Sequence, residues 1–278
     1  MGYNCVVLIK QVPDTKKITG QAMNDDGTVN RAALPAIFDP EDLNALELAL
    51  QIKEKFGGKV TAITMGLPTA AEILRESLFR GADEAILVTD RKCAASDTLA
   101  TSYILSCAVK KLEHDIVLCG RQAIDGDTAQ VGPQLAEKLG LTPLSYVEEL
   151  TELNDSTITV RRAIENGWQM ARTKLPVLLT VTDMANEPRV PAARRLMKYK
   201  NSRAPIEIQK QIKQERNRLR RLKAAVELEE VSESISRTDE RIKTVEQEIE
   251  DRRQRLESLK RSEERRVGKE CVSEWRSR

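Results

Sequence analysis

The amino-acid sequence predicts an α/β protein with a doubly wound, mostly parallel sheet, followed by a long charged helix or coiled coil. Short apolar runs alternate with amphipathic stretches four times between residues 4 and 139. That rhythm is typical of parallel strands joined by right-handed helical crossovers. After residue 205 the sequence becomes strongly charged, and its apolar residues recur at spacings of three and four, which is the coiled-coil pattern.

Composition narrows the class of protein. The chain has 278 residues, of which 40% are hydrophobic and 32% charged, and its net charge is only +2. This balance gives no general basis for binding nucleic acid. No apolar run approaches the ~20 residues that span a membrane, and the N-terminus lacks the pattern of a signal peptide. We therefore expect no nucleic-acid partner and no membrane span.

The cysteines and the single histidine argue against disulfide and metal chemistry. None of the five cysteines forms a CxxC pair, and their number is odd. This indicates reduced thiols in a cytoplasmic protein. His114 stands alone, so neither a histidine-based metal site nor a Ser–His triad is expected, and no catalytic residue is predicted.

The first strand and helix have clear local signals. Asn4–Ile9 is continuously apolar, as in a central parallel strand, and Lys10–Lys17 is predicted as the loop at its carboxyl end. Residues 18–31 indicate an irregular, hairpin-like excursion with a turn at Asp26-Gly27. A helix is predicted to begin at Asp39-Pro40, because Asp is a favourable N-cap and Pro suits the first helical position.

The alternation continues to residue 119. The predicted elements are strands at Lys59–Thr64, Glu84–Thr89 and Asp115–Cys119 and helices at Pro68–Arg80 and Ser96–Leu112. Gly81 is expected as the C-cap of the first of these helices, and Ser96 or Asp97 as the N-cap of the second. The loops after the strands should meet at one edge of the sheet, where open α/β sheets bind ligands.

The segment after the strand at Asp115–Cys119 predicts an anion site. Gly120–Gly126 is expected to form a loop, and Asp127–Leu139 an amphipathic helix that Asp127 and Thr128 could cap. Free N–H groups at a helix N-terminus favour anions, so the residues predict a phosphate or pyrophosphate site at Gly126–Val131. The alternative is a junction that binds nothing, since neither a GxGxxG motif nor a P-loop is present.

Three separated blocks resemble the electron transfer flavoprotein beta-subunit family. They are LIKQVPDT at residues 8–15, GRQAIDGDTAQVGP at 120–133 and RTKLPVLLTVTDMANEPR at 172–189. The resemblance covers about residues 1–200 and implies an adenine-nucleotide alpha-hydrolase-like sheet. KQVPDT and DGDTAQVGP resemble the bifurcating or Fix-type forms. The resemblance therefore implies an electron-carrier subunit that works with an alpha subunit and is not a stand-alone enzyme.

The resemblance also implies a nucleotide, FAD, with AMP as the alternative. The contacts that it implies are Leu8, Asp39, Pro40, Glu41, Asp42, Met65, Gly120, Arg121, Gln122, Ala123, Ile124, Asp125, Gly126, Asp127, Thr128, Ala129, Gln130 and Val131. Gly126–Val131 would hold the diphosphate through backbone N–H groups and the Thr128 hydroxyl. Ala129 replaces a polar residue of the family. Arg121 is the candidate for a cation near the flavin, or else it forms a surface or interface salt bridge.

A partner-binding loop is implied further along. On composition alone, the segment at residues 186–200 is a solvated basic loop. In the family the matching segment docks onto acyl-CoA dehydrogenases through an aliphatic anchor; here the aligned residue is Ala193, which favours a different partner. The loop residues implied are Arg189, Val190, Pro191, Ala192, Ala193, Arg194, Arg195, Leu196, Met197 and Lys198. The implied partners are an alpha subunit and a flavin-dependent dehydrogenase, acyl-CoA dehydrogenase-like or other, with ferredoxin or flavodoxin as further candidates.

The segment between the anion site and this loop reads as strands. Tyr146–Leu153 and Thr157–Ala163 alternate and predict a hairpin. Gln169–Thr173 and Val177–Thr182 continue the strand pattern.

The last third of the chain predicts an extension. The apolar residues that would form the seam of a coiled coil are Leu228, Val231, Ile235, Ile242, Val245, Ile249, Leu256 and Leu259. A continuous helix here would be about 90 Å long, but a change of register near Val226–Leu228 predicts a hinge or hairpin. The alternative is a solvated charged helix without a partner. We divide the chain into a nucleotide-binding domain (1–200), a helical extension (201–260) and a non-native tail (261–278) that resembles translated sequencing-adapter sequence.

Two other functions remain open at this point. One is a non-redox adenine-nucleotide-binding module on a similar sheet. The other is a coiled-coil assembly protein whose α/β domain is vestigial, although the complete anion loop argues against it.

Overall fold

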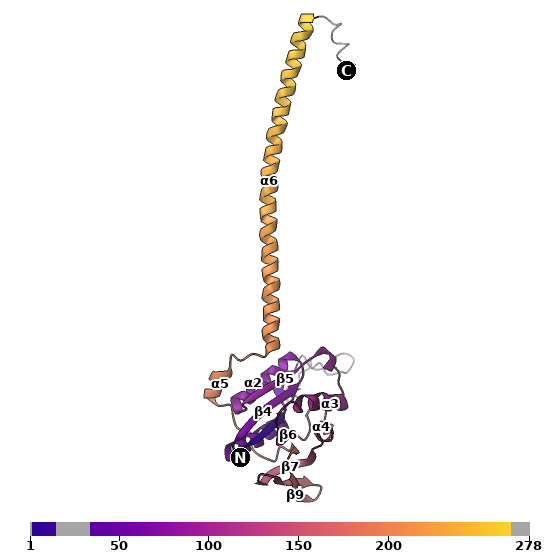
Figure 1. The fold of residues 1–278 in the computed structure, drawn as a ribbon, viewed down its shortest axis with the longest axis vertical. Helices are drawn as coiled ribbons and strands as arrows, with labels where there is room; N and C mark the ends of the chain where they lie inside the picture. Colours follow the sequence, from indigo (N-terminus) through magenta and orange to yellow (C-terminus); the bar gives the residue numbers. More distant parts are fainter. Residues whose placement is uncertain (1, 15–33, 268–278) are drawn as a thin grey trace. The chain divides into compact units, whose positions relative to one another are not determined.

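The computed structural model describes residues 2–14 and 34–267. It divides the chain into two units, Met1–Ile208 and Gln209–Arg278. The first unit contains the sheet and its helices, and the second contains most of helix α6 (Pro205–Val267) (Figure 1). The excursion expected at residues 18–31, with its turn at Asp26-Gly27, lies outside the described residues, as does the end of the predicted tail.

The first unit is built on one eight-stranded sheet. Its strand order is β5-β4-β1-β6-β10-β7-β8-β9. The strands are β1 (Tyr3–Leu8), β4 (Gly58–Met65), β5 (Glu84–Val88), β6 (Ile116–Gly120), β7 (Thr142–Leu153), β8 (Thr157–Ile164), β9 (Gly167–Lys174) and β10 (Val177–Val181). From β5 to β7 all neighbours are parallel, and β7, β8 and β9 pair in antiparallel fashion. The prediction of a doubly wound, mostly parallel sheet is confirmed.

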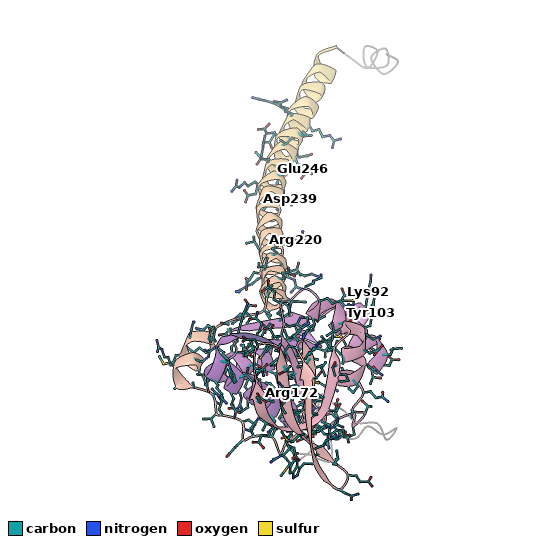
Figure 2. The ribbon with its side chains drawn as sticks, turned by 60° about the horizontal axis from the view of Figure 1, so that its bottom comes forward. Lys92, Tyr103, Arg172, Arg220, Asp239 and Glu246 are labelled. Carbon is teal, nitrogen blue, oxygen red and sulfur yellow. The ribbon has the colours of Figure 1, made fainter. Side chains whose placement is uncertain are left out.

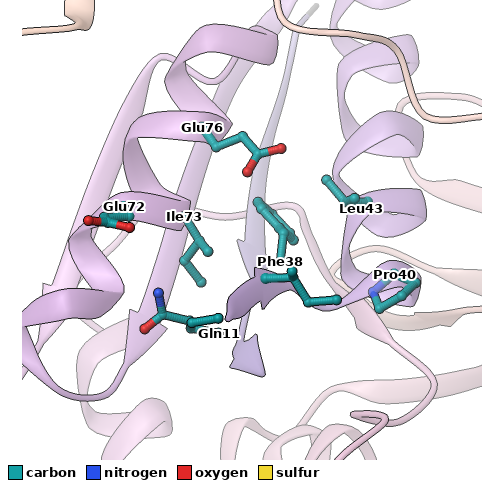
Figure 3. Close-up of a pocket in the computed structure, with 9 residues that line it drawn as sticks. Gln11, Phe38, Pro40, Leu43, Glu72, Ile73 and Glu76 are labelled. Atoms are coloured by element: carbon teal, nitrogen blue, oxygen red, sulfur yellow. The ribbon is translucent and has the colours of Figure 1, made fainter. Parts of the chain in front are cut away.

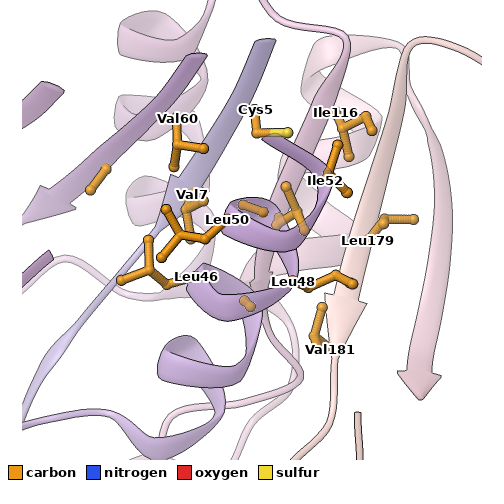
Figure 4. Packing of buried hydrophobic residues seen from close by; sticks show 14 of the residues in the cluster. Cys5, Val7, Leu46, Leu48, Leu50, Ile52, Val60, Ile116, Leu179 and Val181 are labelled. Carbon is orange, nitrogen blue, oxygen red and sulfur yellow. The ribbon is translucent and has the colours of Figure 1, made fainter. Parts of the chain in front are cut away.

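Helices cover both faces of this sheet. They are α1 (Pro40–Phe56), α2 (Ala71–Arg80), α3 (Thr98–Val109) and α4 (Val131–Leu139), with 3-10 turns η4 (Pro68–Ala70) and η5 (Arg91–Cys93). Because strand side chains alternate between faces, Val7 packs with Leu46 of α1, whereas Val6 packs in a second cluster with Leu135 of α4. Figure 4 shows the first cluster, where Val7, Leu46 and Leu50 meet between α1 and the sheet.

The order in which the chain adds strands to the sheet shows at which edge a ligand is expected to bind. The chain runs outward from β1 through α1 to β4 and through α2 to β5, then returns through α3 to β6 on the other side of β1. The order therefore reverses between β1 and β6. In open α/β sheets the crevice beyond the carboxyl ends of such strands is where ligands bind, and here Leu8 and Gly120 end the two strands.

Several local predictions need correction. The loop expected at Lys10–Lys17 contains a short strand, β2 (Gln11–Pro13), which pairs with β3 (Ala36–Phe38). Gly120, expected in a loop, ends β6 and is buried. Its backbone N–H and those nearby find partners far away in the sequence, which local patterns do not reveal.

The hinge or hairpin expected near Val226–Leu228 is also absent, because the α6 backbone is one continuous helix of 63 residues. At ~1.5 Å per residue it is about 95 Å long. A change of heptad register moves the apolar stripe to another face of a helix without interrupting its backbone hydrogen bonds. The predicted register change therefore does not mark a hinge.

Candidate functional site

Three carboxylates at the start of α1 hold the backbone that leaves β6. The hydrogen bonds are from Gly120 N–H to Asp42 Oδ1 at 2.7 Å, from Gln122 N–H to Glu41 Oε2 at 3.0 Å and from Ile124 N–H to Asp39 Oδ1 at 2.9 Å. Gly120, Gln122 and Ile124 thus each donate a backbone hydrogen bond to a different acid. The first half of the predicted anion loop is fixed by α1.

This arrangement corrects the role expected for Asp39. It stands at the N-cap position of α1, but its side chain makes no hydrogen bond that caps the helix. Its carboxylate instead accepts the Ile124 N–H, 85 positions away in sequence. The N-cap preference of Asp for helix starts located the helix correctly but not the partner of the side chain.

The same cluster ties down the end of β1. The second oxygen of Asp42, Oδ2, accepts the Lys10 N–H at 2.7 Å. The Lys10 ammonium lies 2.5 Å from Asp125 Oδ1 on the loop after β6. Asp42 and Lys10 therefore join the two strand ends between which the sheet order reverses. Lys10 was not among the predicted site residues, because its position in a loop gave no signal of a partner.

The acids of this cluster are buried at an electrostatic cost. Burial raises the pKa of Asp39 to about 6, and it raises the pKa values of Glu41 and Asp42 as well. The neighbouring Asp39 charge raises the pKa of Asp42 further. Asp39 Oδ2 is buried without a hydrogen-bond partner among the described residues. Buried charges are retained where they are needed to satisfy other groups, and here those groups are loop N–H donors.

The half-buried Arg121 side chain has its partners within this chain. Its Nη2 lies 2.8 Å from Glu41 Oε1, and its guanidinium lies 5.8 Å from the centre of the Tyr146 ring. Tyr146 has a left-handed φ of 61° and donates its N–H to Thr180 Oγ1. Arg121 thus forms a salt bridge within this chain, which was the alternative role predicted for it. Its position near a flavin stays a prediction.

Two glycines are required by packing around the site. A Cβ on Gly120 would lie 2.8 Å from the Glu41 Cβ and 2.9 Å from the Asp42 nitrogen, and one on Gly132 would lie 2.8 Å from the Thr180 Cγ2. These glycines let α1 and α4 approach the strand ends closely. A Cβ on Gly126 would meet nothing within 4 Å, so that position is open.

The second half of the loop differs from the prediction. Helix α4 begins at Val131, four residues later than expected, and Gln130 occupies its N-cap position. Asp127 and Ala129 have φ values of 47° and 52°, which are incompatible with a right-handed helix. Asp127 and Thr128 therefore do not cap α4, and Asp127 Oδ1 instead accepts a hydrogen bond from Gln122 Nε2 at 3.0 Å.

This conformation leaves four successive amides, which we call the α4 nest: the backbone N–H groups of Thr128, Ala129, Gln130 and Val131. Within the described residues these four groups donate no hydrogen bond. Left-handed residues alternating with others turn successive N–H groups toward one point, and such nests bind anions. The helix N-terminus adds partial positive charge. The α4 nest therefore suits a phosphate or diphosphate.

Helix α3 supports this end of α4. Thr98 Oγ1 donates to Gln130 Oε1 at 2.8 Å, and Ser102 Oγ to Gln134 Oε1 at 3.2 Å. Asp97 caps α3 by accepting the Ala100 N–H, as one of the two predicted caps. Thr98 and Ser102 were not among the predicted site residues, because no pattern in the sequence predicts that the N-termini of α3 and α4 lie in contact.

The remaining predicted contacts lie around the same edge. Leu8 is buried in the core cluster on the α3 and α4 face. Met65 is half-buried at the end of β4, and Pro40 is exposed. Contact of these residues with a nucleotide stays a prediction.

A pocket of about 430 Å³ lies beside this site (Figure 3). It is lined by Gln11, Ala36, Ile37, Phe38, Pro40, Leu43, Glu72, Ile73 and Glu76. Pro40 belongs to both regions, but no residue of the loop after β6 lines the pocket. It is therefore separate from the α4 nest.

The segment expected as a partner-binding loop contains a short helix, α5 (Ala193–Tyr199). Two of its predicted basic residues turn inward. Arg189 pairs with Glu47 at 2.7 Å, and Arg195 Nε donates to the Leu78 carbonyl at 2.7 Å. The exposed large apolar side chains of the segment are Val190, Leu196 and Met197, which are 81%, 41% and 73% exposed. The description of the segment as a wholly solvated basic loop is wrong.

The described residues contain no group of three or more His, Cys, Asp or Glu side chains placed to hold a metal ion. In the same residues no helix is long and apolar enough to cross a membrane.

Comparisons with known proteins bear on these features. Residues 26–211 match the electron transfer flavoprotein domain. The electron transfer flavoprotein subunit beta of Thermoanaerobacterium thermosaccharolyticum is 49% identical over 201 residues, which are 72% of this chain and 76% of the relative. The acryloyl-CoA reductase electron transfer subunit gamma of Anaerotignum propionicum is 46% identical over 66% of this chain and 69% of its own. Protein FixA of Azorhizobium caulinodans is 47% identical over 66% and 67%.

Proposed function

The chain belongs to the electron transfer flavoprotein beta-subunit family, in its Fix-type form, and on that premise we propose that it binds FAD at the α4 nest. In this proposal it passes electrons, together with an alpha subunit, between a dehydrogenase and a redox acceptor. The role of an electron-transfer subunit is common to the relatives described above.

The α4 nest is the observation that carries the proposal. Its four unbonded N–H groups at the start of a nine-residue helix fit the charge of a diphosphate. The acids of α1 fix the residues that precede the nest through hydrogen bonds to their backbone N–H groups. Preorganisation of this kind lowers the cost of ordering a loop upon binding.

The residues of this chain would bind and orient the nucleotide. The N–H groups of the nest would hold the diphosphate, and the exposed Thr128 would add its hydroxyl. When bound, the flavin supplies the electron-transfer chemistry, and protein groups tune it by hydrogen bonds and charge. Arg121 is the candidate for a nearby positive charge.

The choice of FAD over AMP rests on the open space at Gly126. A nucleotide larger than AMP needs such room beyond its first phosphate. The test is to purify the chain with its alpha subunit, denature the complex and quantify the released nucleotides by chromatography. We expect two FAD molecules per heterodimer. One FAD and one AMP would overturn the assignment to FAD and leave AMP at the same site.

Site variants can locate the nucleotide. Thr128→Ala should reduce nucleotide retention severalfold, since one hydrogen bond is worth roughly 1 kcal/mol. Thr142→Ala is the matched control, because Thr142 is exposed at the amino end of β7. If both variants retain nucleotide as the unchanged protein does, the hydroxyl contact is excluded.

We propose a partner surface that comprises Val190, Ala193 and Met197, all exposed. Its partner would be a flavin-dependent dehydrogenase, acyl-CoA dehydrogenase-like or other, with ferredoxin or flavodoxin as further redox partners in the cytoplasm. Met197→Asp should slow electron transfer to the partner and leave the flavin content unchanged. Loss of flavin in this variant would assign Met197 to the nucleotide-binding unit instead.

We also propose that residues 1–200 form the nucleotide-binding domain, 201–260 a separate extension and 261–278 a tail without function. The ion pair of Arg75 with Glu207 at 3.0 Å favours keeping the chain to Ile208 in a truncation. A chain ending at Ile208 should retain its nucleotide in complex with the alpha subunit. The competing proposal, a non-redox adenine-nucleotide-binding module, predicts that the complex with the alpha subunit carries no yellow chromophore contributed by this chain.

A further inference from the structure

Helix α6 carries an apolar stripe without a partner in the described part of the chain. Ile242, Val245 and Ile249 are 50%, 52% and 53% exposed. Their spacings of three and four place them on one face of the helix. Half-exposed aliphatic side chains on one stripe indicate a surface that is covered in an assembly.

The stripe has a heptad register. With Ile242 and Ile249 at a positions, Val245 and Arg252 occupy d positions. The sequence continues this register with Ile235 and Leu256 at a positions. Isoleucine occupies the a positions, as is common in two-stranded coiled coils, and we take the covering element to be a single helix.

The charges beside the stripe identify that helix. The g positions are Arg241 and Glu248, and the e positions are Glu246 and Arg253. All four side chains are exposed, and among the described residues none of them forms an ion pair. Figure 2 labels Asp239 and Glu246, two acids one heptad apart at e positions of α6.

In a parallel coiled coil a g residue faces the e residue five positions later on the partner helix. For two identical α6 helices in register, Arg241 faces Glu246 and Glu248 faces Arg253. Both contacts join opposite charges, and each occurs twice by symmetry. We propose that α6 pairs with α6 of a second copy of this chain as a parallel, in-register coiled coil over residues 241–253.

The same register sets a limit on the strength of this dimer. Arg252 occupies a d position and therefore faces its own copy in the partner. Two guanidinium groups in the seam repel each other, and polar seam residues specify register at a cost in stability. The coiled coil is therefore a weak, reversible contact whose register depends on the e and g charges.

The test measures the mass of the full-length chain by sedimentation equilibrium over a range of concentrations. The unchanged chain should show a reversible monomer–dimer equilibrium. Arg241→Glu should weaken dimerisation about tenfold, since two symmetric attractions become repulsions of similar size. Arg241→Glu combined with Glu246→Arg should restore it. Lys243→Glu is the matched control, because it makes the same charge change at a b position outside the seam.

Each other outcome overturns the proposal. A chain that stays monomeric at all concentrations has no such dimer. An equilibrium that persists unchanged in Ile242→Asp places the contact elsewhere. If the double exchange fails to restore the dimer, the helices are not parallel and in register. If dimers form only when a different protein is added, the occupant of the stripe is a heterologous helix.

Discussion

Helices α1 and α6 use the same kinds of charged residue in opposite ways. In α1 the acids Glu41, Asp42 and Glu47 are buried, and the first two bond backbone groups 78 and 81 positions away. In α6 every described side chain from residue 236 to residue 255 is exposed. The sequence composition of a helix does not reveal this difference, because it depends on what packs against the helix.

A charge has a fixed partner where it is buried. A buried carboxylate must be satisfied by specific groups, and its removal leaves donors unpaired at a cost of about 1–3 kcal/mol each. An exposed charge on a helix is solvated, and a single pair contributes only about 0.5 kcal/mol. Single substitutions should therefore have large effects in the α1 cluster and small effects on α6, where only repeated charges act together.

The largest expected effect is that of Asp42→Ala. It removes the acceptor for two backbone donors, Gly120 N–H and Lys10 N–H. Relief of the buried charge offsets part of this loss, so we expect destabilisation by about 2–4 kcal/mol and loss of bound nucleotide. Urea unfolding and nucleotide analysis measure the two effects.

Asp115→Ala is the control for this variant. Asp115 also accepts a backbone N–H, that of Asn4 at 2.7 Å, but at the amino ends of the parallel strands. It should destabilise the fold by about 1–3 kcal/mol without changing nucleotide content. Equal nucleotide loss in both variants would show that the effect of Asp42 is only general unfolding.

The second effect concerns pH. Burial raises the pKa of Asp39 to about 6, whereas an unfolded Asp has a pKa near ~3.9. Between these values the folded state binds the extra proton, so the contribution of Asp39 to stability falls as pH rises from ~4 to ~6, by up to ~3 kcal/mol. Asp39→Asn keeps an oxygen for the Ile124 N–H and carries no charge.

Asp39→Asn should therefore abolish this part of the pH dependence and be more stable than the unchanged chain at pH 7, by about 1–2 kcal/mol. The measurement is chemical unfolding of both proteins between pH 4.5 and pH 7.5. Stability curves that stay parallel over this range would contradict the assignment. Asp125→Asn, which alters the partner of Lys10, a carboxylate whose side chain is 7% exposed, controls for a general loss of charge near the loop.

The third effect concerns the proposed α6–α6 dimer, which a single substitution should strengthen. Arg252→Leu removes the like charges that face each other in the proposed seam and should tighten dimerisation on the order of tenfold. Arg253→Leu makes the same change one residue later, at an e position that faces Glu248, and should weaken dimerisation instead. Sedimentation equilibrium of the full chain distinguishes the two. The same sign of change in both variants would contradict the register.

The smallest effect is expected at Glu250→Ala, at a b position of α6. Its side chain is exposed and lies outside the seam, so the free energy of unfolding should change by less than about 0.5 kcal/mol. Thermal unfolding followed by circular dichroism measures it. A decrease of more than about 1 kcal/mol in the free energy of unfolding would contradict the view that Glu250 is solvated and has no fixed partner.

Local patterns in the sequence were sufficient to predict the order of the helices and strands and their types. Apolar runs predicted β1, β4, β5 and β6 to within one or two residues. Asp39-Pro40 predicted the start of α1, and alternation predicted the β7–β8 hairpin. Three separated blocks identified the family. These signals lie within a few residues of one another, because local hydrogen bonding and side-chain periodicity have short ranges in sequence.

The way in which distant segments meet became visible only in the folded chain. Strand β10 enters the sheet between β6 and β7, the acids of α1 bond the loop after β6 rather than their own helix, and left-handed residues at Asp127 and Ala129 delay α4 to Val131. The first two of these features satisfy buried backbone groups across long separations in the chain. Such partners are chosen when the sheet closes, because every buried N–H and C=O must then be paired.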